Sequence, residues 1–81
     1  MNIQVSNISL NTIDADIRKL FSPFGTVDSA MVIRNKFNGR SKGSAIINMP
    51  SDAQGRQAII SLHQTMMDGK KISVDELRDR F

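Results

Sequence analysis

The chain has 81 residues, contains no cysteine, and carries a net charge of +3 from eleven lysine and arginine residues against eight aspartate and glutamate residues. This length indicates one domain, and the lack of cysteine excludes a disulfide framework and a thiolate metal site. The charge is too small for a histone-like protein. No apolar run reaches the length of a membrane span and no signal-peptide pattern precedes the first strand-like run, so we expect a small, complete cytoplasmic protein without a membrane partner.

The first third of the chain changes from an alternating to a helical pattern. Apolar residues nearly alternate over residues 3–10, which predicts a strand that leads into a turn. Asn11 and Thr12 are favourable N-cap residues, and Asp14 and Asp16 place negative charge in the first turn of the helix that follows. Apolar residues then recur at helical spacing until a Ser-Pro pair and a glycine end the pattern.

The middle of the chain predicts a β-hairpin. Residues 27–33 and 42–49 are rich in branched apolar residues and indicate a second and a third strand. Asn38 and Gly39 lie between these strands, and both residue types accept positive φ, which favours a hairpin turn. A proline ends the third strand.

The last third predicts a second helix and a final strand. Ser51 and Gln54 have the spacing of a capping box, which marks the start of the helix. Asp68 and Gly69 indicate a turn, and a short last strand follows over residues 72–74. Residues 76–81 are expected to form a C-terminal tail, in which apolar side chains at i, i+4 spacing across 75–81 favour a short amphipathic helix.

These elements occur once each, in the order β-α-β-β-α-β. Two right-handed crossovers then place both helices on one face of a four-stranded antiparallel sheet with strand order 4-1-3-2. The expected fold class is α+β with a ferredoxin-like arrangement. The opposite face of the sheet is left open, and such a face is either solvated or used.

The chain resembles an RNA recognition motif domain over residues 1–75. The segment "IQVSNI" (residues 3–8) resembles the family's hexapeptide on the first strand, and "KGSAIINM" (residues 42–49) its octapeptide on the third strand. Between them, "DIRKLFSPFGTVDSAMVI" is similar to the family's first helix, Phe-Gly turn and second strand. The resemblance implies non-catalytic binding of single-stranded RNA, and it is greatest to small, single-domain bacterial members.

The departures from the family lie at the base-stacking positions. The family carries aromatic residues at the second hexapeptide position and at the third and fifth octapeptide positions, where they stack on bases. This chain has Gln4, Ser44 and Ile46 there, all on the open face by strand alternation. Met31 and Ile33 share that face by the same rule. We expect these five residues to form the sheet part of an RNA site that is weakened by the missing stacks.

A basic stretch without acidic residues surrounds the predicted hairpin. It contains Arg34, Lys36, Arg40 and Lys42, and such a cluster is suited to phosphate. Lys42 occupies the octapeptide's basic position, which contacts phosphate in the family. Phe37 lies in the same loop and is expected either to stack on a base or to pack on the hairpin. The hairpin is therefore predicted to capture RNA electrostatically.

Other uses of the open face remain possible from the sequence. An exposed aliphatic patch often marks a protein contact, so a protein-interaction module, which includes a homodimer, is the alternative function. The C-terminal tail with Leu77 and Phe81 is a third candidate to cover the face.

Enzymatic chemistry has little support in the sequence. The single histidine, His63, is expected to meet the carbonyl groups at the end of the second helix. There is no cysteine nucleophile, phosphate-binding loop or metal-ligand pattern. We therefore expect no enzyme activity, no cofactor and no metal site.

Overall fold

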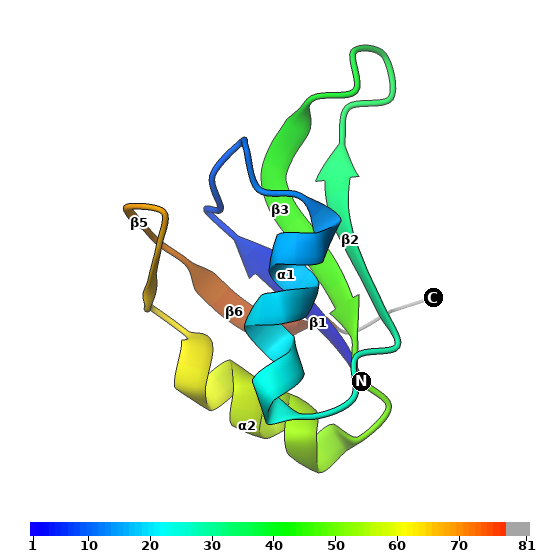
Figure 1. Cartoon of the computed structure of the whole chain (residues 1–81), viewed down its shortest axis with the longest axis vertical. Helices are drawn as coiled ribbons and strands as arrows, with labels where there is room; N and C mark the ends of the chain where they lie inside the picture. The colour runs from blue at the N-terminus through cyan, green and yellow to red at the C-terminus, as the bar shows by residue number, and fades with distance from the viewer. Residues whose placement is uncertain (78–81) are drawn as a thin grey trace.

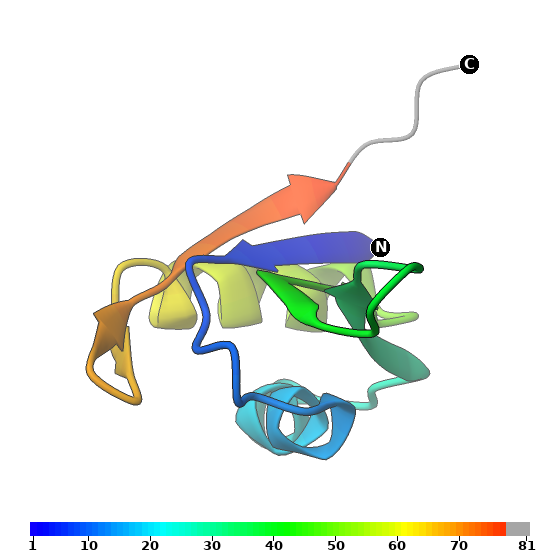
Figure 2. The same cartoon turned by 90° about the horizontal axis from the view of Figure 1, so that it is seen from above.

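The computed structural model describes residues 1–77, in which a four-stranded antiparallel sheet carries two helices on one face (Figures 1 and 2). The sheet order is β2-β3-β1-β6, which confirms the predicted α+β fold and the order 4-1-3-2. A separate small sheet pairs β4 with β5. The elements are β1 Asn2–Ser6, α1 Asp14–Phe21, a 3₁₀ turn Ser22–Phe24, β2 Ser29–Arg34, β3 Ser41–Asn48, α2 Asp52–Leu62, β4 Met66–Met67, β5 Lys70–Lys71 and β6 Ser73–Leu77.

Strand alternation separates the core from the open face. Ile3 and Val5 on β1 are fully buried, as are their partners Ile47 and Ala45 on β3. Between them Gln4 remains half-buried on the opposite face. The core also contains Ile8, Ile17, Phe21, Val27, Val32, Met49, Ala58, Leu62, Ile72 and Val74. One face of the sheet therefore holds the whole apolar core together with the helices.

The start of α1 differs from the prediction. Ile13, and not Asn11 or Thr12, occupies the N-cap position. The Ile13 N–H donates to Oδ2 of Asp16 at 3.1 Å, so an acid inside the first turn satisfies this group. Thr12 is 1% exposed, and its hydroxyl has no hydrogen-bond partner among residues 1–77. The N-cap therefore lies one residue after Thr12, because the Asp16 side chain reaches back to the Ile13 N–H.

The predicted capping box of α2 is only half formed. Ser51 Oγ accepts the Gln54 N–H at 3.3 Å, as predicted. The Gln54 side chain does not return to Ser51, since its Oε1 accepts the Thr26 N–H at 3.2 Å instead. Gly25 precedes Thr26 with φ 151°, and a Cβ there would overlap the Gln54 side chain. Gln54 thus links the start of α2 to the loop after α1.

Both predicted turns exist, but they differ in geometry. Asp68 and Gly69 both adopt positive φ and join β4 to β5, which the sequence did not predict as strands. In the β2–β3 hairpin only Gly39 adopts positive φ, and Asn38 does not. The hairpin is a longer loop, closed by the Asn35 N–H bonded to the Arg40 carbonyl at 2.8 Å.

The final strand is longer than predicted. β6 continues to Leu77, so residues 75–77 are extended and the expected helix across 75–81 is wrong for these residues. Leu77 pairs with Asn2 at the end of the sheet. Phe81 and the rest of 78–81 lie outside the described residues, where the tail prediction stays a prediction.

Each edge strand of the sheet is bonded by a side chain from the helix layer. On β2 the Val32 N–H donates to Oδ1 of Asp14 at 2.8 Å. On β6 the Val74 N–H donates to Nδ1 of His63, the C-cap of α2, at 3.0 Å. The Nδ1 of His63 therefore accepts a strand N–H, and within residues 1–77 the ring makes no hydrogen bond to a helix carbonyl, so the expected contact with the helix carbonyls is wrong.

Candidate functional site

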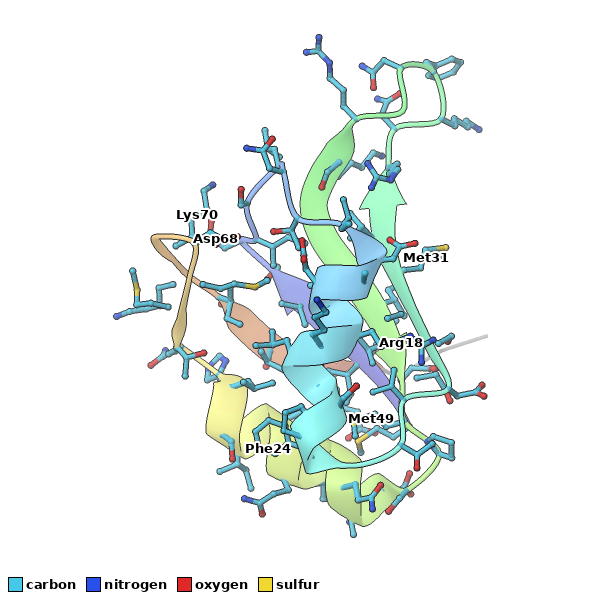
Figure 3. All side chains as sticks on the ribbon, viewed as in Figure 1. Arg18, Phe24, Met31, Met49, Asp68 and Lys70 are labelled. Atoms are coloured by element: carbon cyan, nitrogen blue, oxygen red, sulfur yellow. The ribbon has the colours of Figure 1, made fainter. Side chains whose placement is uncertain are left out.

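The open face is arranged in rows of directly opposed side chains. The central row crosses all four strands in the order Met31, Ile46, Gln4 and Asp75. Met31 is 58% exposed and extends from β2 away from α1 (Figure 3). Of the predicted sheet residues, Gln4, Met31 and Ile46 therefore meet in one line, with an aliphatic half and a polar half.

The row nearer the hairpin consists of small polar side chains. Ser44 pairs with Ser6, and Ser6 pairs in turn with Ser73. Ile33 has no directly opposed residue, because the register of β2 against β3 shifts between Val32 and Arg34. The structure thus separates Ser44 and Ile33 from the central row.

The row at the other end is polar on β2, β3 and β1, and it ends with Leu77 on β6. The Asn48 Nδ2 donates to Oδ1 of Asn2 at 2.7 Å across β3 and β1. Figure 2 shows both helices beneath the opposite face of the sheet, and no element within residues 1–77 packs over these rows. Within residues 1–77 the central row is therefore uncovered.

Asp75 is a residue of the open face that was not predicted from the sequence. The i, i+4 spacing of Leu77 and Phe81 favoured a helix there. The alternation of Ile72 and Val74 would have placed Asp75 on the open face if it had been continued by one residue. This carboxylate is exposed and stands opposite Gln4.

The β2–β3 loop presents its cations and an aromatic ring to solvent. Phe37 is 90% exposed, which excludes packing on the hairpin as the reason for its position. Its backbone N–H donates to Oδ1 of Asn35, and the Lys36 Nζ lies 5.8 Å from the Phe37 ring centroid. Arg34 turns back toward the loop, with its Nη1 3.4 Å from the Gly39 carbonyl. Phe37 is thus free to stack on a ligand.

The entry to β3 is shaped by a glycine. Gly43 adopts φ 79°, a conformation that other residues rarely take, and its carbonyl accepts the Ile8 N–H at 3.1 Å. Lys42 and Arg40 precede it and are exposed. The cations of the loop and of β3 consequently lie at one corner of the sheet, while Asp75 and Glu76 lie on the far edge strand.

Within residues 1–77, no group of three or more histidine, cysteine, aspartate or glutamate side chains could hold a metal ion. The same part of the chain has no helix that is long and apolar enough to cross a bilayer. The two candidate features of the described residues are an open sheet face and a cationic loop.

Comparison with protein families gives a match to the RNA recognition motif over residues 3–73. The 31 kDa chloroplastic ribonucleoprotein of Nicotiana sylvestris is 38% identical over 78 residues, which are 96% of this chain and 25% of that protein. The 28 kDa chloroplastic ribonucleoprotein of the same plant is 36% identical. The chain spans only 28% of that second relative, so both are much longer proteins.

A relative of similar length also matches. The putative RNA-binding protein RbpD of Nostoc is 30% identical over 80 residues, which cover 99% of this chain and 85% of that protein. Among solved structures, the crystal structure of RNA Binding Protein PG1 superposes with a TM-score of 0.95 at 34% identity and covers 99% of this chain and 96% of that one. The SXL-lethal protein/RNA complex has a TM-score of 0.93 at 22% identity, covers 99% of this chain and 48% of that one, and shares the fold.

Proposed function

The chain belongs to the RNA recognition motif family, and from this membership we propose that it binds single-stranded RNA without catalysis. The observation that carries the proposal is the open sheet face. Gln4, Ser44 and Ile46 stand there at the positions where the family stacks bases, and both helices lie on the other side. RNA would be laid across this face, with its backbone reaching the cationic loop.

Electrostatic capture supplies most of the affinity in this proposal. Aromatic stacking on a base is worth roughly 1–3 kcal/mol, and none of the three family positions offers a ring. Met31 and Ile46 offer aliphatic contact in its place, which is weaker. Arg34, Lys36 and Lys42 then attract phosphate, and Phe37 supplies a ring at the loop.

The opposed pair of the exposed Met31 and the half-buried Ile46 also supports a second candidate, a protein contact through the same face, which includes a second copy of this chain. Ile46→Lys separates the two functions. A cation at the centre of the face disrupts an apolar protein contact, whereas it leaves RNA capture intact or strengthens it. For the wild type and the variant, sedimentation measures self-association and RNA titration measures RNA affinity, each independently of the other.

The direct test is an amide chemical-shift titration with short single-stranded oligonucleotides at low salt. The proposal expects shifts at Gln4, Met31, Ser44 and Ile46, and across residues 34–42. A titration without shifts, or with shifts confined to the helices, would contradict it. The matched control is the same titration on a variant with Lys36 and Arg40 replaced by glutamine, in which the shifts should need more RNA.

A further inference from the structure

The polar half of the central row pairs an amide with a carboxylate. Gln4 on β1 and Asp75 on β6 are directly opposed, and side chains in such pairs lie about 5 Å apart at Cβ. The Asp75 side chain is exposed, and no hydrogen bond or ion pair from another residue within 1–77 occupies it. The Gln4 amide is also without a side-chain hydrogen bond in that part of the chain. Both groups are therefore available to a ligand.

A carboxylate on an RNA-binding face restricts what can approach it. It only accepts hydrogen bonds, and its charge repels a phosphate group, so the sugar-phosphate backbone is kept away from Asp75. A base can approach only with an edge that presents donors. The two carboxylate oxygens favour two adjacent donors that they can bind together.

Guanine is the RNA base that meets this requirement. Its N1–H and N2–H groups are adjacent on the Watson–Crick edge, and this edge is accessible in single-stranded RNA. Uracil offers a single N3–H between two carbonyl oxygens, which the second carboxylate oxygen would repel. Adenine and cytosine each place an amino group beside an unprotonated ring nitrogen, which is an acceptor.

We propose that Gln4 and Asp75 select a guanine on this half of the sheet, a proposal that rests on the RNA-binding function proposed above. Asp75 accepts from N1–H and N2–H, and the Gln4 amide beside it donates to O6. The pair thus reads the full Watson–Crick edge through hydrogen bonds, at a place where the family's stacking ring on β1 is absent. Met31 and Ile46 contact the neighbouring base without selecting it.

The test uses short oligouridines that carry guanine, inosine, adenine, cytosine or uracil at one central position, titrated at low salt by fluorescence anisotropy. We expect the guanine oligonucleotide to bind roughly fivefold or more tightly than the adenine, cytosine and uracil ones, as for a good bidentate contact. Inosine, which lacks the N2 amino group, should fall between them.

The decisive variant is Asp75→Asn, with Glu76→Gln as its matched control. Both remove one negative charge from β6, but Glu76 is opposed to the buried Ile3 and so belongs to the other face. Glu76→Gln should bind all oligonucleotides slightly more tightly, whereas Asp75→Asn should bind the adenine, cytosine and uracil oligonucleotides slightly more tightly and the guanine oligonucleotide more weakly. Only Asp75→Asn should lose the preference for guanine, and thermal unfolding of both variants verifies that they remain folded.

The possible failures are distinguishable. Equal binding of all five oligonucleotides by the wild type, or a guanine preference that persists in Asp75→Asn, would overturn the selection of guanine while RNA binding stands. No binding of any oligonucleotide at low salt would overturn the proposed function, and the guanine site with it.

Discussion

The backbone N–H of Val32 donates to Oδ1 of Asp14 at 2.8 Å, so the first residue of α1 closes the outer side of β2. The two residues are 18 positions apart in the chain. Four residues further along α1, Arg18 donates to the carbonyl of Val27 at 2.8 Å, just before β2 begins. The helix α1 therefore bonds β2 through an anion, Asp14, and the segment just before β2 through a cation, Arg18. These two side chains are four residues, about one helical turn, apart.

Asp14→Ala should lower the free energy of unfolding by about 1–3 kcal/mol, because it removes a charge-assisted hydrogen bond and a favourable charge at the helix N-terminus. Asp14→Asn keeps an acceptor oxygen and should lose less. Urea denaturation measures both. Asp28→Ala removes the same charge from an exposed side chain and should change stability by no more than about 0.5 kcal/mol. An Asp14→Ala protein as stable as this control would show that the bond to Val32 is not a stabilising one.

His63→Ala should accelerate hydrogen exchange of the Val74 amide and cost about 1 kcal/mol of stability, because the Val74 N–H loses its acceptor. His63→Asn places an oxygen near the position of Nδ1 and should restore part of the protection. Exchange followed residue by residue by NMR is the measurement. The Val5 amide, in the adjacent strand of the same row, serves as the internal reference. Unchanged hydrogen exchange at Val74 in the alanine variant would show that His63 does not protect the Val74 N–H.

Replacing Arg34, Lys36, Arg40 and Lys42 together with glutamine should abolish most RNA binding. In the wild type, the logarithm of affinity should fall with the logarithm of salt by roughly 0.7 per phosphate contacted. Lys36→Gln and Lys19→Gln are a matched pair of single changes, since Lys19 lies on α1 behind the sheet. Only Lys36→Gln should weaken RNA binding. An affinity that is insensitive to salt, or equal in the two single variants, would remove the loop from the mechanism.

The triple variant Gln4→Tyr, Ser44→Phe and Ile46→Phe restores rings at the three stacking positions of the family. It should bind single-stranded RNA at least about tenfold more tightly, since even one added stack is worth roughly 1–3 kcal/mol. The three side chains lie on the sheet face away from the core, so the variant should keep the fold. Oligonucleotide titration at fixed salt measures the gain. A folded triple variant with no gain would show that stacking is not what limits affinity.

Alternation within strands made the fold and the main faces predictable from the sequence. It placed Gln4 and Ile46 opposite to Ile3 and Ile47 without knowledge of the structure, because a buried face imposes its period of two on every strand that contributes to it. Asp75 was missed where a helical spacing competed with this period.

The hydrogen bonds that decide the two helix starts could not be predicted. Thr12 is a favourable cap by residue type, yet the cap position went to Ile13, since Asp16 was available to satisfy its N–H. Gln54 had the spacing of a capping box, but an unbonded N–H on Thr26 offered its side chain another partner. At Gln54 the partner, Thr26, lies 28 positions away and only the folded chain supplies it. At Ile13 the partner, Asp16, is three residues away, and this local bond outweighed the preference of Thr12 for the cap.

The bonds at Val32 and Val74 bear on how copies of this protein can meet. These two residues end one line of backbone groups across the sheet, through Ala45 and Val5. An incoming strand that extended the sheet at either side would first have to displace Asp14 or His63. Exposed strand edges are where chains join into fibres, and here β2 is obstructed within the strand and β6 near its start. Crowding of this protein should therefore favour reversible contact through side chains over irreversible growth by strand addition.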